Sequence, residues 1–381
     1  MKIHRALFLL VLVGSQAVAQ TTDPTISTVN VDGRKVRIRV AGTGSPAVVF
    51  ESGFGGDTLD AWAPIFSGVA RLTRTFAYDR AGMGQSDAVT TERSYKAIAS
   101  ELRAVLQHEK IAPPYILVGH SYGGALVRAY YALYPAEVSA IVFVDPVTEQ
   151  MLNEDQAHMI AVQEAMIGNA PQAVQAEWAF LKKEAVDGFP LLRAMPKPNV
   201  PMTLLVARVN RPNGWARAVL AQYGPWIEER DDSSMIVSAN SSHYIQRDQP
   251  ELVIGATRSM LFPNPLGALE RSLRDKGIDA SVSLFRQQQV RYPKEEITPR
   301  LLNTLGYMQM RERRIDDALR IFTLNVEAFP LDANAYDSLG EAYAAKGDRE
   351  NALANYRKSL QMDPSNRNAA EWIAKLESKK P

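Results

Sequence analysis

The sequence predicts an α/β domain with a doubly wound, mostly parallel sheet, followed by an all-helical repeat domain. Over residues 25–263, short apolar segments rich in β-branched residues alternate with amphipathic helical segments. This order is typical of a parallel sheet with helices on both faces. From residue 264 to residue 381 strand-like segments stop, and one helical segment follows another. A chain of 381 residues is long enough for two such domains.

The predicted strands of the first domain are mostly continuous apolar runs, as expected for strands buried on both faces. An opening hairpin over residues 25–40 turns at Asp32 and Gly33. The later strands are expected at 47–51, 74–79, 115–119, 140–145, 202–208 and 233–239, with helices among others at 94–109, 123–135 and 249–262. Residues 146–200 are too many for a simple connection between two strands. We therefore expect a helical cap inserted above the sheet there.

The helical domain contains an internal repeat with a period of 34 residues. Four pairs of similar residues have this spacing: Gly306 and Gly340, Ala318 and Ala352, Phe322 and Tyr356, and Pro330 and Pro364. The period and these positions resemble the tetratricopeptide repeat, a pair of antiparallel helices. The repeats are expected at about 297–330 and 331–364, within a domain over 264–381. Such a domain predicts an interaction role, with a protein partner or with a second copy of the chain.

The first 19 residues have the composition of a secretory signal peptide. Lys2 and Arg5 precede an apolar run over 6–13, and Ala17 and Ala19 supply the small residues of a cleavage site. The run is shorter than the roughly 20 residues that cross a bilayer. We therefore expect cleavage after Ala19 and export to the periplasm or the medium, with no membrane span in the mature protein.

Composition excludes several function classes. The 43 basic and 42 acidic residues give a net charge of +1, which argues against a nucleic-acid-binding protein. The chain has no cysteine, so disulfides, thiolate catalysis and cysteine metal sites are excluded. The five histidines are dispersed, and the sequence implies neither a metal nor a cofactor.

Ser121 is the candidate nucleophile. It lies at the centre of Gly-His-Ser-Tyr-Gly (119–123), between the predicted strand 115–119 and the helix that starts at 123. In this setting a serine occupies a sharp strand-to-helix turn that raises its hydroxyl above the sheet. Gly119, Gly123 and Gly124 supply the small neighbours that such a turn requires. The alternative is a serine in an ordinary glycine-rich turn.

The base and the acid follow from their positions in the predicted sheet. His243 comes after the last strand and before the last helix of the α/β domain, so it should lie at the edge above Ser121. The other histidines lie in the signal segment, an earlier helix, the turn itself and the cap. Asp145 ends the strand 140–145, where a carboxylate can orient the imidazole of His243. Glu149 is the second choice for the acid, and the alternative role of Asp145 is to cap a helix.

Two backbone N–H groups are needed to stabilise an oxyanion. Tyr122, which follows the nucleophile, is expected to supply one. The other is expected from Phe54 in the segment Ser-Gly-Phe-Gly-Gly (52–56) that follows the strand 47–51. Without a substrate site, that segment would be a plain glycine-rich turn.

Together these segments resemble the α/β-hydrolase superfamily over residues 25–263. Four landmarks occur in order: the glycine-rich segment 52–56, residues 78–87, the serine turn 119–124 and the histidine segment 241–253. The resemblance implies acyl transfer to water by a Ser-His-Asp triad. The dehalogenases and epoxide hydrolases of the superfamily carry aspartate where Ser121 stands. Many members place the acid after the strand that follows the cap, whereas this sequence has no carboxylate there before Glu228.

The function expected from the resemblance is hydrolysis of carboxylic esters with a small-molecule acyl substrate. Two alternatives remain open. One is a peptidase of the proline iminopeptidase type, in which Glu149 or another cap carboxylate would hold the substrate amino group. The other is a non-catalytic adaptor that binds partners through its helical repeats.

Overall fold

A computed structural model describes residues 24–55, 58–149, 164–165, 167–210 and 214–378. The chain divides into two compact units, Met1–Leu261 and Phe262–Pro381. The predicted signal peptide, residues 1–19, lies outside the described residues. Within the described ranges, no helix is both long enough and apolar enough to cross a membrane.

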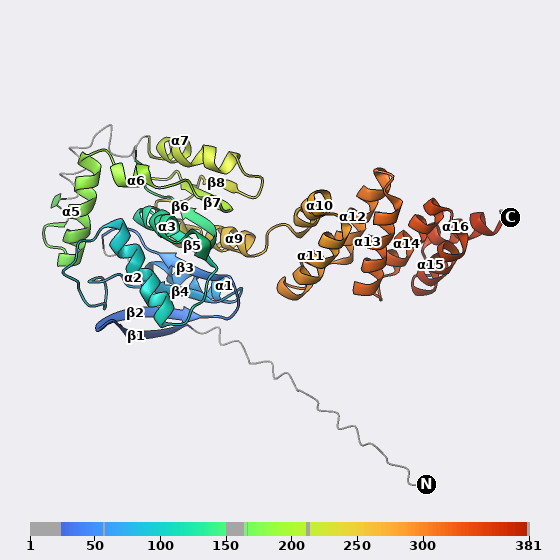
Figure 1. The fold of residues 1–381 in the computed structure, drawn as a ribbon, viewed down its shortest axis with the longest axis horizontal. Helices are drawn as coiled ribbons and strands as arrows, with labels where there is room; N and C mark the ends of the chain where they lie inside the picture. Colours follow the sequence, from blue (N-terminus) through green and yellow to red (C-terminus); the bar gives the residue numbers. More distant parts are fainter. Residues whose placement is uncertain (1–23, 56–57, 150–163, 166, 211–213, 379–381) are drawn as a thin grey trace, which may run out of the picture. The chain divides into compact units, whose positions relative to one another are not determined.

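The first unit is built on one eight-stranded sheet with the order β1-β2-β4-β3-β5-β6-β7-β8 (Figure 1). The strands are β1 (Thr25–Val31), β2 (Arg34–Ala41), β3 (Ala47–Glu51), β4 (Thr75–Tyr78), β5 (Tyr115–His120), β6 (Val138–Val144), β7 (Met202–Ala207) and β8 (Ser234–Ser238). β1 and β2 form the expected antiparallel hairpin, and β2 also pairs antiparallel with β4. The other neighbours are parallel, so the prediction of a mostly parallel sheet is confirmed.

Helices cover both faces of this sheet. They are α1 (Ala63–Ala70), α2 (Tyr95–His108), α3 (Tyr122–Leu133), α7 (Trp215–Glu228), α8 (Ile245–Asp248) and α9 (Pro250–Leu261), with 3-10 turns η1 (Leu59–Trp62) and η2 (Pro135–Glu137). The main core joins α2, α3 and α7 to one face through buried side chains such as Leu117, Phe143 and Leu204 of the strands. α1 and α9 pack against each other. Burying apolar side chains from both layers is the dominant stabilising term for such a domain.

The interval between β6 and β7 contains helices, as predicted. It contains α5 (Gln172–Val186) and α6 (Pro190–Ala194), while residues 150–163 and 166 of the predicted cap lie outside the described residues. The ring of Phe180 on α5 meets Tyr95 of α2 edge-on at 4.9 Å. Trp178 on the same helix lies 5.8 Å from the ring of Phe54. α5 therefore packs on α2 and on the loop that follows β3.

The second unit is all-helical in its described part, as predicted. Its helices are α10 (Pro265–Lys276), α11 (Ile278–Arg291), α12 (Pro299–Arg311), α13 (Ile315–Ala328), α14 (Ala333–Lys346), α15 (Arg349–Met362) and α16 (Arg367–Ser378). A Cβ atom on Gly306 would lie 2.5 Å from the Phe322 ring, and one on Gly340 would lie 3.0 Å from the Tyr356 ring. The two repeats thus use the same glycine-on-aromatic contact to bring their helices together.

Candidate active site

Ser121 lies between β5 and α3 in a strained backbone conformation. Its φ is 52° and its ψ is −118°, a combination that residues with a side chain rarely adopt. Its N–H donates to the carbonyl of Val144 at 3.1 Å, and its own carbonyl accepts from Gly124 at 2.9 Å and from Val147 at 3.1 Å. Three backbone hydrogen bonds therefore stabilise this strained conformation. Ser121 lies at the position that the serine occupies in a strand-to-helix nucleophile turn.

The glycines around Ser121 allow neighbouring backbone segments to approach closely. A Cβ atom on Gly119 would lie 2.5 Å from the carbonyl oxygen of Gly123. One on Gly123 would lie 2.2 Å from the carbonyl oxygen of Glu51, and one on Gly124 would lie 2.6 Å from Pro146. Only glycine fits at such distances. The start of α3 is consequently pressed against the end of β3, which brings the serine turn next to the loop that carries Phe54.

His243 and Asp145 form a close pair at the same edge of the sheet. Nδ1 of His243 lies 2.7 Å from Oδ2 of Asp145. The other carboxylate oxygen of Asp145 accepts the backbone N–H of Ala207 at 3.0 Å, and the N–H of Asp145 donates to Leu205 at 2.8 Å. Asp145 is fully buried, whereas about a fifth of the His243 side chain is exposed. This arrangement gives the imidazole a buried, doubly anchored carboxylate partner.

His120 and Trp215 surround the imidazole, and sequence reasoning gave neither of them a role. Nε2 of His120 donates to the carbonyl of His243 at 2.9 Å, and the two imidazole rings lie 4.5 Å apart. The ring of Trp215 meets His243 edge-on at 5.6 Å. His120 thereby ties the histidine loop to the serine turn across 123 positions of sequence, which no local pattern signals.

Glu149, the second choice for the acid, is engaged elsewhere. Its Oε1 accepts from Nη1 of Arg128 at 3.2 Å and from Nε2 of Gln222 at 3.0 Å. Its backbone N–H donates to the side-chain oxygen of Gln222 at 3.0 Å. Asp145, in contrast, contacts His243 directly. The geometry therefore favours Asp145 as the partner of the imidazole.

The two expected oxyanion donors belong to neighbouring segments. Phe54 lies in the loop after β3, and Tyr122 is the first residue of α3. Their rings meet edge-on with centroids 6.2 Å apart. The close approach of Gly123 to Glu51 explains this proximity, since it joins the two segments at the backbone. The loop and the helix start are thus adjacent at the backbone.

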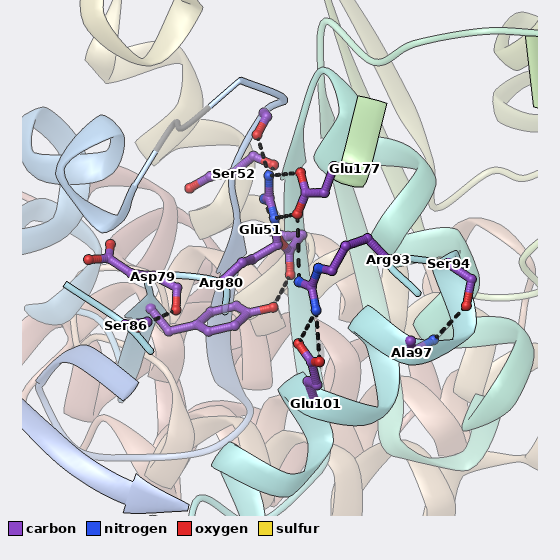
Figure 2. Close-up of polar contacts among 12 residues, drawn as sticks. Glu51, Ser52, Asp79, Arg80, Ser86, Arg93, Ser94, Ala97, Glu101 and Glu177 are labelled. Atoms are coloured by element: carbon purple, nitrogen blue, oxygen red, sulfur yellow. Dashed lines mark hydrogen bonds and ion pairs between the residues drawn. The ribbon is translucent and has the colours of Figure 1, made fainter. Parts of the chain in front are cut away.

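A buried polar cluster lies beneath the loop after β3 (Figure 2). Arg80 is at its centre and contacts the carboxylates of Glu51, at the end of β3, and of Glu177, on cap helix α5. Arg93 donates to both carboxylate oxygens of Glu101 at 2.7 and 2.8 Å, and lies 3.6 Å from Glu177. Residues 78–87 are one of the landmarks seen in the sequence, but nothing in the sequence pairs Arg80 with Glu177, 97 positions away.

Burial and charge act in opposite directions within this cluster. Burial raises the pKa of Glu51, while Arg80 and the hydroxyl of Tyr78 counteract that rise without cancelling it. Burial alone would lower the pKa of Arg80, but Glu177 and Glu51 outweigh it, so this pKa lies well above the ordinary value. Arg80 is consequently a permanent buried cation, and its carboxylate partners are what make its burial tolerable.

Among the residues that the structure describes, no group of three or more His, Asp or Glu side chains could hold a metal ion. What the arrangement offers is a hydroxyl, an imidazole and a carboxylate at one edge of the sheet.

The family of the first unit is established by comparison with known proteins. A family model described as alpha/beta hydrolase fold matches residues 46–270, which is more than half of the chain. The protein therefore belongs to the alpha/beta hydrolase family. A model of the tetratricopeptide repeat matches residues 333–366, in agreement with the second predicted repeat.

Individual relatives cover different shares of the chain. The uncharacterized protein YqjL of Bacillus subtilis is 24% identical over 218 residues, which are 56% of this chain and 82% of YqjL. YbdG of the same organism is 30% identical over 118 residues, 31% of this chain and 36% of YbdG. The 1-acylglycerol-3-phosphate O-acyltransferase ABHD5 of Rattus norvegicus is 34% identical over 106 residues, 26% of this chain and 29% of that protein. The match thus spans most of YqjL but about a third of the other two.

Solved structures of similar fold include enzymes with different chemistries. The epoxide hydrolase CorEH is 13% identical with a TM-score of 0.49, and the match covers 63% of this chain and 99% of that one. The esterase EaEST from Exiguobacterium antarcticum is 17% identical with a TM-score of 0.47, covering 62% of this chain and 98% of that one. Identities this low do not distinguish one reaction from another.

Proposed function

We propose that the protein is a serine hydrolase that cleaves carboxylic esters through a covalent intermediate on Ser121. The observation that carries the proposal is the 2.7 Å contact between His243 and the buried Asp145, beside a serine held at φ 52°. A nucleophile, a base and an orienting acid on three different strand ends are the parts that acyl transfer requires.

The proposed reaction proceeds in two half-reactions. The Ser121 hydroxyl attacks the ester carbonyl while Nε2 of His243 takes its proton, and Asp145 holds the other ring nitrogen. The backbone N–H groups of Phe54 and Tyr122 stabilise the oxyanion. The intermediate collapses, and the alcohol leaves with the proton from His243. Water then attacks the acyl-enzyme with His243 again as base, releasing the acid and restoring Ser121.

Two carboxylates near the cap, Glu149 and Glu177, favour an ester over a peptide substrate with a free amino group, because both are already paired. An aminopeptidase needs an available anion to hold that amino group. Glu149 is occupied by Arg128 and Gln222, and Glu177 is fully buried against Arg80. An acyl substrate without a charged amine makes no such demand.

Labelling with a fluorophosphonate probe and turnover of acyl esters of graded chain length test the proposal. Ser121→Ala should lose the label and reduce hydrolysis by several orders of magnitude. Ser100→Ala is the matched control, because Ser100 lies on α2 and contacts the hydroxyl of Tyr134. It should behave like the wild type. An inert wild type would favour the repeat-based adaptor, and a fully active Ser121→Ala would exclude the nucleophile.

We further propose that the protein is exported and that its repeats bind a protein partner or a second copy. Support for export is the basic start, apolar run and small residues of the first 19 positions. N-terminal sequencing of protein from the native host should find Gln20 as the first residue. An intact Met1 on the purified protein would contradict export by this route.

A further inference from the structure

One guanidinium group, that of Arg80, contacts two backbone carbonyls of the loop that carries Phe54. Nη1 of Arg80 donates to Ser52 O at 2.8 Å and to Glu51 Oε1 at 2.9 Å. Nη2 donates to Gly53 O at 2.7 Å and to Glu177 Oε2 at 3.0 Å, and Nε donates to Glu177 Oε1 at 2.9 Å. These bonds use all five donors of the group. Arg80 therefore has no freedom to move without breaking a contact to the loop or to the cap.

The contact to Gly53 bears directly on the N–H of Phe54. Both belong to one peptide unit, in which the carbonyl and the N–H point in opposite directions. Fixing the carbonyl toward Arg80 on the buried side aims the N–H to the other side of that peptide. A cationic donor on the carbonyl also polarises the amide, which strengthens its N–H as a donor. One contact thus sets both the direction and the strength of the proposed oxyanion donor.

Glu177 links this arrangement to the cap. It lies on α5 and is fully buried, and its two carboxylate oxygens accept hydrogen bonds from Nε and Nη2 of Arg80. The next residue, Trp178, packs on the Phe54 ring at 5.8 Å. The same helix thus touches the loop by an ion pair and by an aromatic contact (Figure 2 shows the ion pair). If α5 shifted, Arg80 would lose two of its five contacts.

We propose that Arg80 and Glu177 are positioning residues that make oxyanion stabilisation by Phe54 depend on the seating of cap helix α5. The inference rests on the proposed function of Ser121. Its structural component, that Glu177 controls the position of the Phe54 amide, can be measured without any substrate.

The first variant is Glu177→Gln in the full chain, which keeps the size of the side chain but removes its charge and one acceptor. Glu101→Gln is the matched control. Glu101 accepts both bonds from Arg93 in the same cluster, but it lies on α2 and not beside the loop. Both variants lose an Arg–carboxylate pair of similar length. Only Glu177→Gln disturbs the guanidinium that holds the Gly53 carbonyl.

Kinetics should separate the two variants. Losing an oxyanion donor altogether costs about 10²–10³ in kcat, so a misaligned donor in Glu177→Gln should cost about 10- to 100-fold, with KM changed less than about threefold. The inhibition constant of a trifluoromethyl ketone, whose adduct with Ser121 carries an oxyanion, should rise in parallel. Glu101→Gln should keep kcat within about twofold. Arg80→Lys, with one nitrogen in place of three, should lose at least as much activity as Glu177→Gln.

The amide signal of Phe54, in protein labelled with ¹⁵N-phenylalanine, provides the readout that needs no activity. It should move in Glu177→Gln and stay in place in Glu101→Gln. An unchanged signal, or equal losses of kcat in the two variants, would overturn the inference. Absent turnover in the wild type, with the signal moving as expected, would instead refute the proposed function and leave the coupling of α5 to the loop in place.

Discussion

Asp145→Asn tests the proposed triad sharply, because the structure limits how the new amide can sit. The carboxylate of Asp145 accepts the N–H of Ala207 at one oxygen and contacts Nδ1 of His243 at the other. A carboxamide has only one oxygen, and the buried N–H of Ala207 needs an acceptor. The amide oxygen of the variant should therefore face Ala207, and its NH2 group should face His243.

That orientation puts the imidazole in the wrong tautomer. Nδ1 of His243 must accept from the amide, so the ring proton moves to Nε2. A protonated Nε2 cannot take the proton of Ser121. The equivalent substitution in a serine protease triad lowers kcat about 10⁴-fold, which corresponds to about 5.4 kcal/mol at about 1.36 kcal/mol per tenfold. We expect a loss of about 10³- to 10⁴-fold here.

The fold should tolerate this substitution. Asp145 has a φ of 43°, in the left-handed region where asparagine is among the best tolerated residues. Its N–H bond to Leu205 does not involve the side chain. The melting temperature of Asp145→Asn should therefore stay close to that of the wild type, and the loss of rate cannot then be attributed to unfolding.

The assay compares kcat/KM of the wild type, Asp145→Asn and Glu149→Gln on the best ester. Glu149→Gln is the matched carboxylate-to-amide control. Glu149 contacts Arg128 and Gln222, so its variant should lose less than about tenfold. A folded Asp145→Asn that keeps more than a tenth of the wild-type rate would refute the tautomer argument. A larger loss in Glu149→Gln would transfer the acid role to that residue.

Three further predictions concern stability and the division of the chain. Burial raises the pKa of Glu137, but hydrogen bonds from Arg103 and a tyrosine lower it overall below 4.5. Glu137→Gln should thus cost about 1–2 kcal/mol at pH 7, and urea titrations should show this difference disappear as the pH falls through the folded-state pKa. Gly306→Ala should destabilise the helical unit by about 1–3 kcal/mol. The loss should exceed that of Gly340→Ala, because a Cβ atom at 306 would lie 2.5 Å from the facing ring and one at 340 would lie 3.0 Å from it. Thermal melting of the two variants measures the difference. A chain ending at Phe262 should keep kcat and KM for small esters, and loss of turnover by the folded truncated protein would contradict this.

The parts of the fold that the sequence predicted are those set by local pattern. The helix expected at 94–109 is α2, Tyr95–His108, and the strand expected at 115–119 is β5, Tyr115–His120. The serine turn is similarly local, because its conformation depends on glycines within a few residues of Ser121. The repeats were evident since glycine and aromatic positions recur at one period.

Contacts between distant segments were not predictable in the same way. Arg80 stands in a recognisable segment, but its partner Glu177 is one of several acidic residues in the cap interval, and only tertiary packing selects it. No role for His120 follows from the sequence, whereas its bond to the carbonyl of His243 connects the histidine loop to the serine turn. A single sequence shows which residues lie near a site along the chain. It does not show which distant side chain pairs with a buried charge.

The order of the strands explains why the proposed triad can take its acid from the end of β6 and not from the end of β7. β5, β6, β7 and β8 are successive neighbours in the sheet, so Ser121, Asp145 and His243 follow β5, β6 and β8. Asp145 reaches the imidazole past the end of β7, and there the N–H of Ala207, the last residue of β7, binds its second oxygen. The backbone of β7 thus steadies a carboxylate that comes from the neighbouring strand. A second carboxylate after β7 would approach the same imidazole nitrogen, and like charges in so confined a place raise the cost of keeping both ionised.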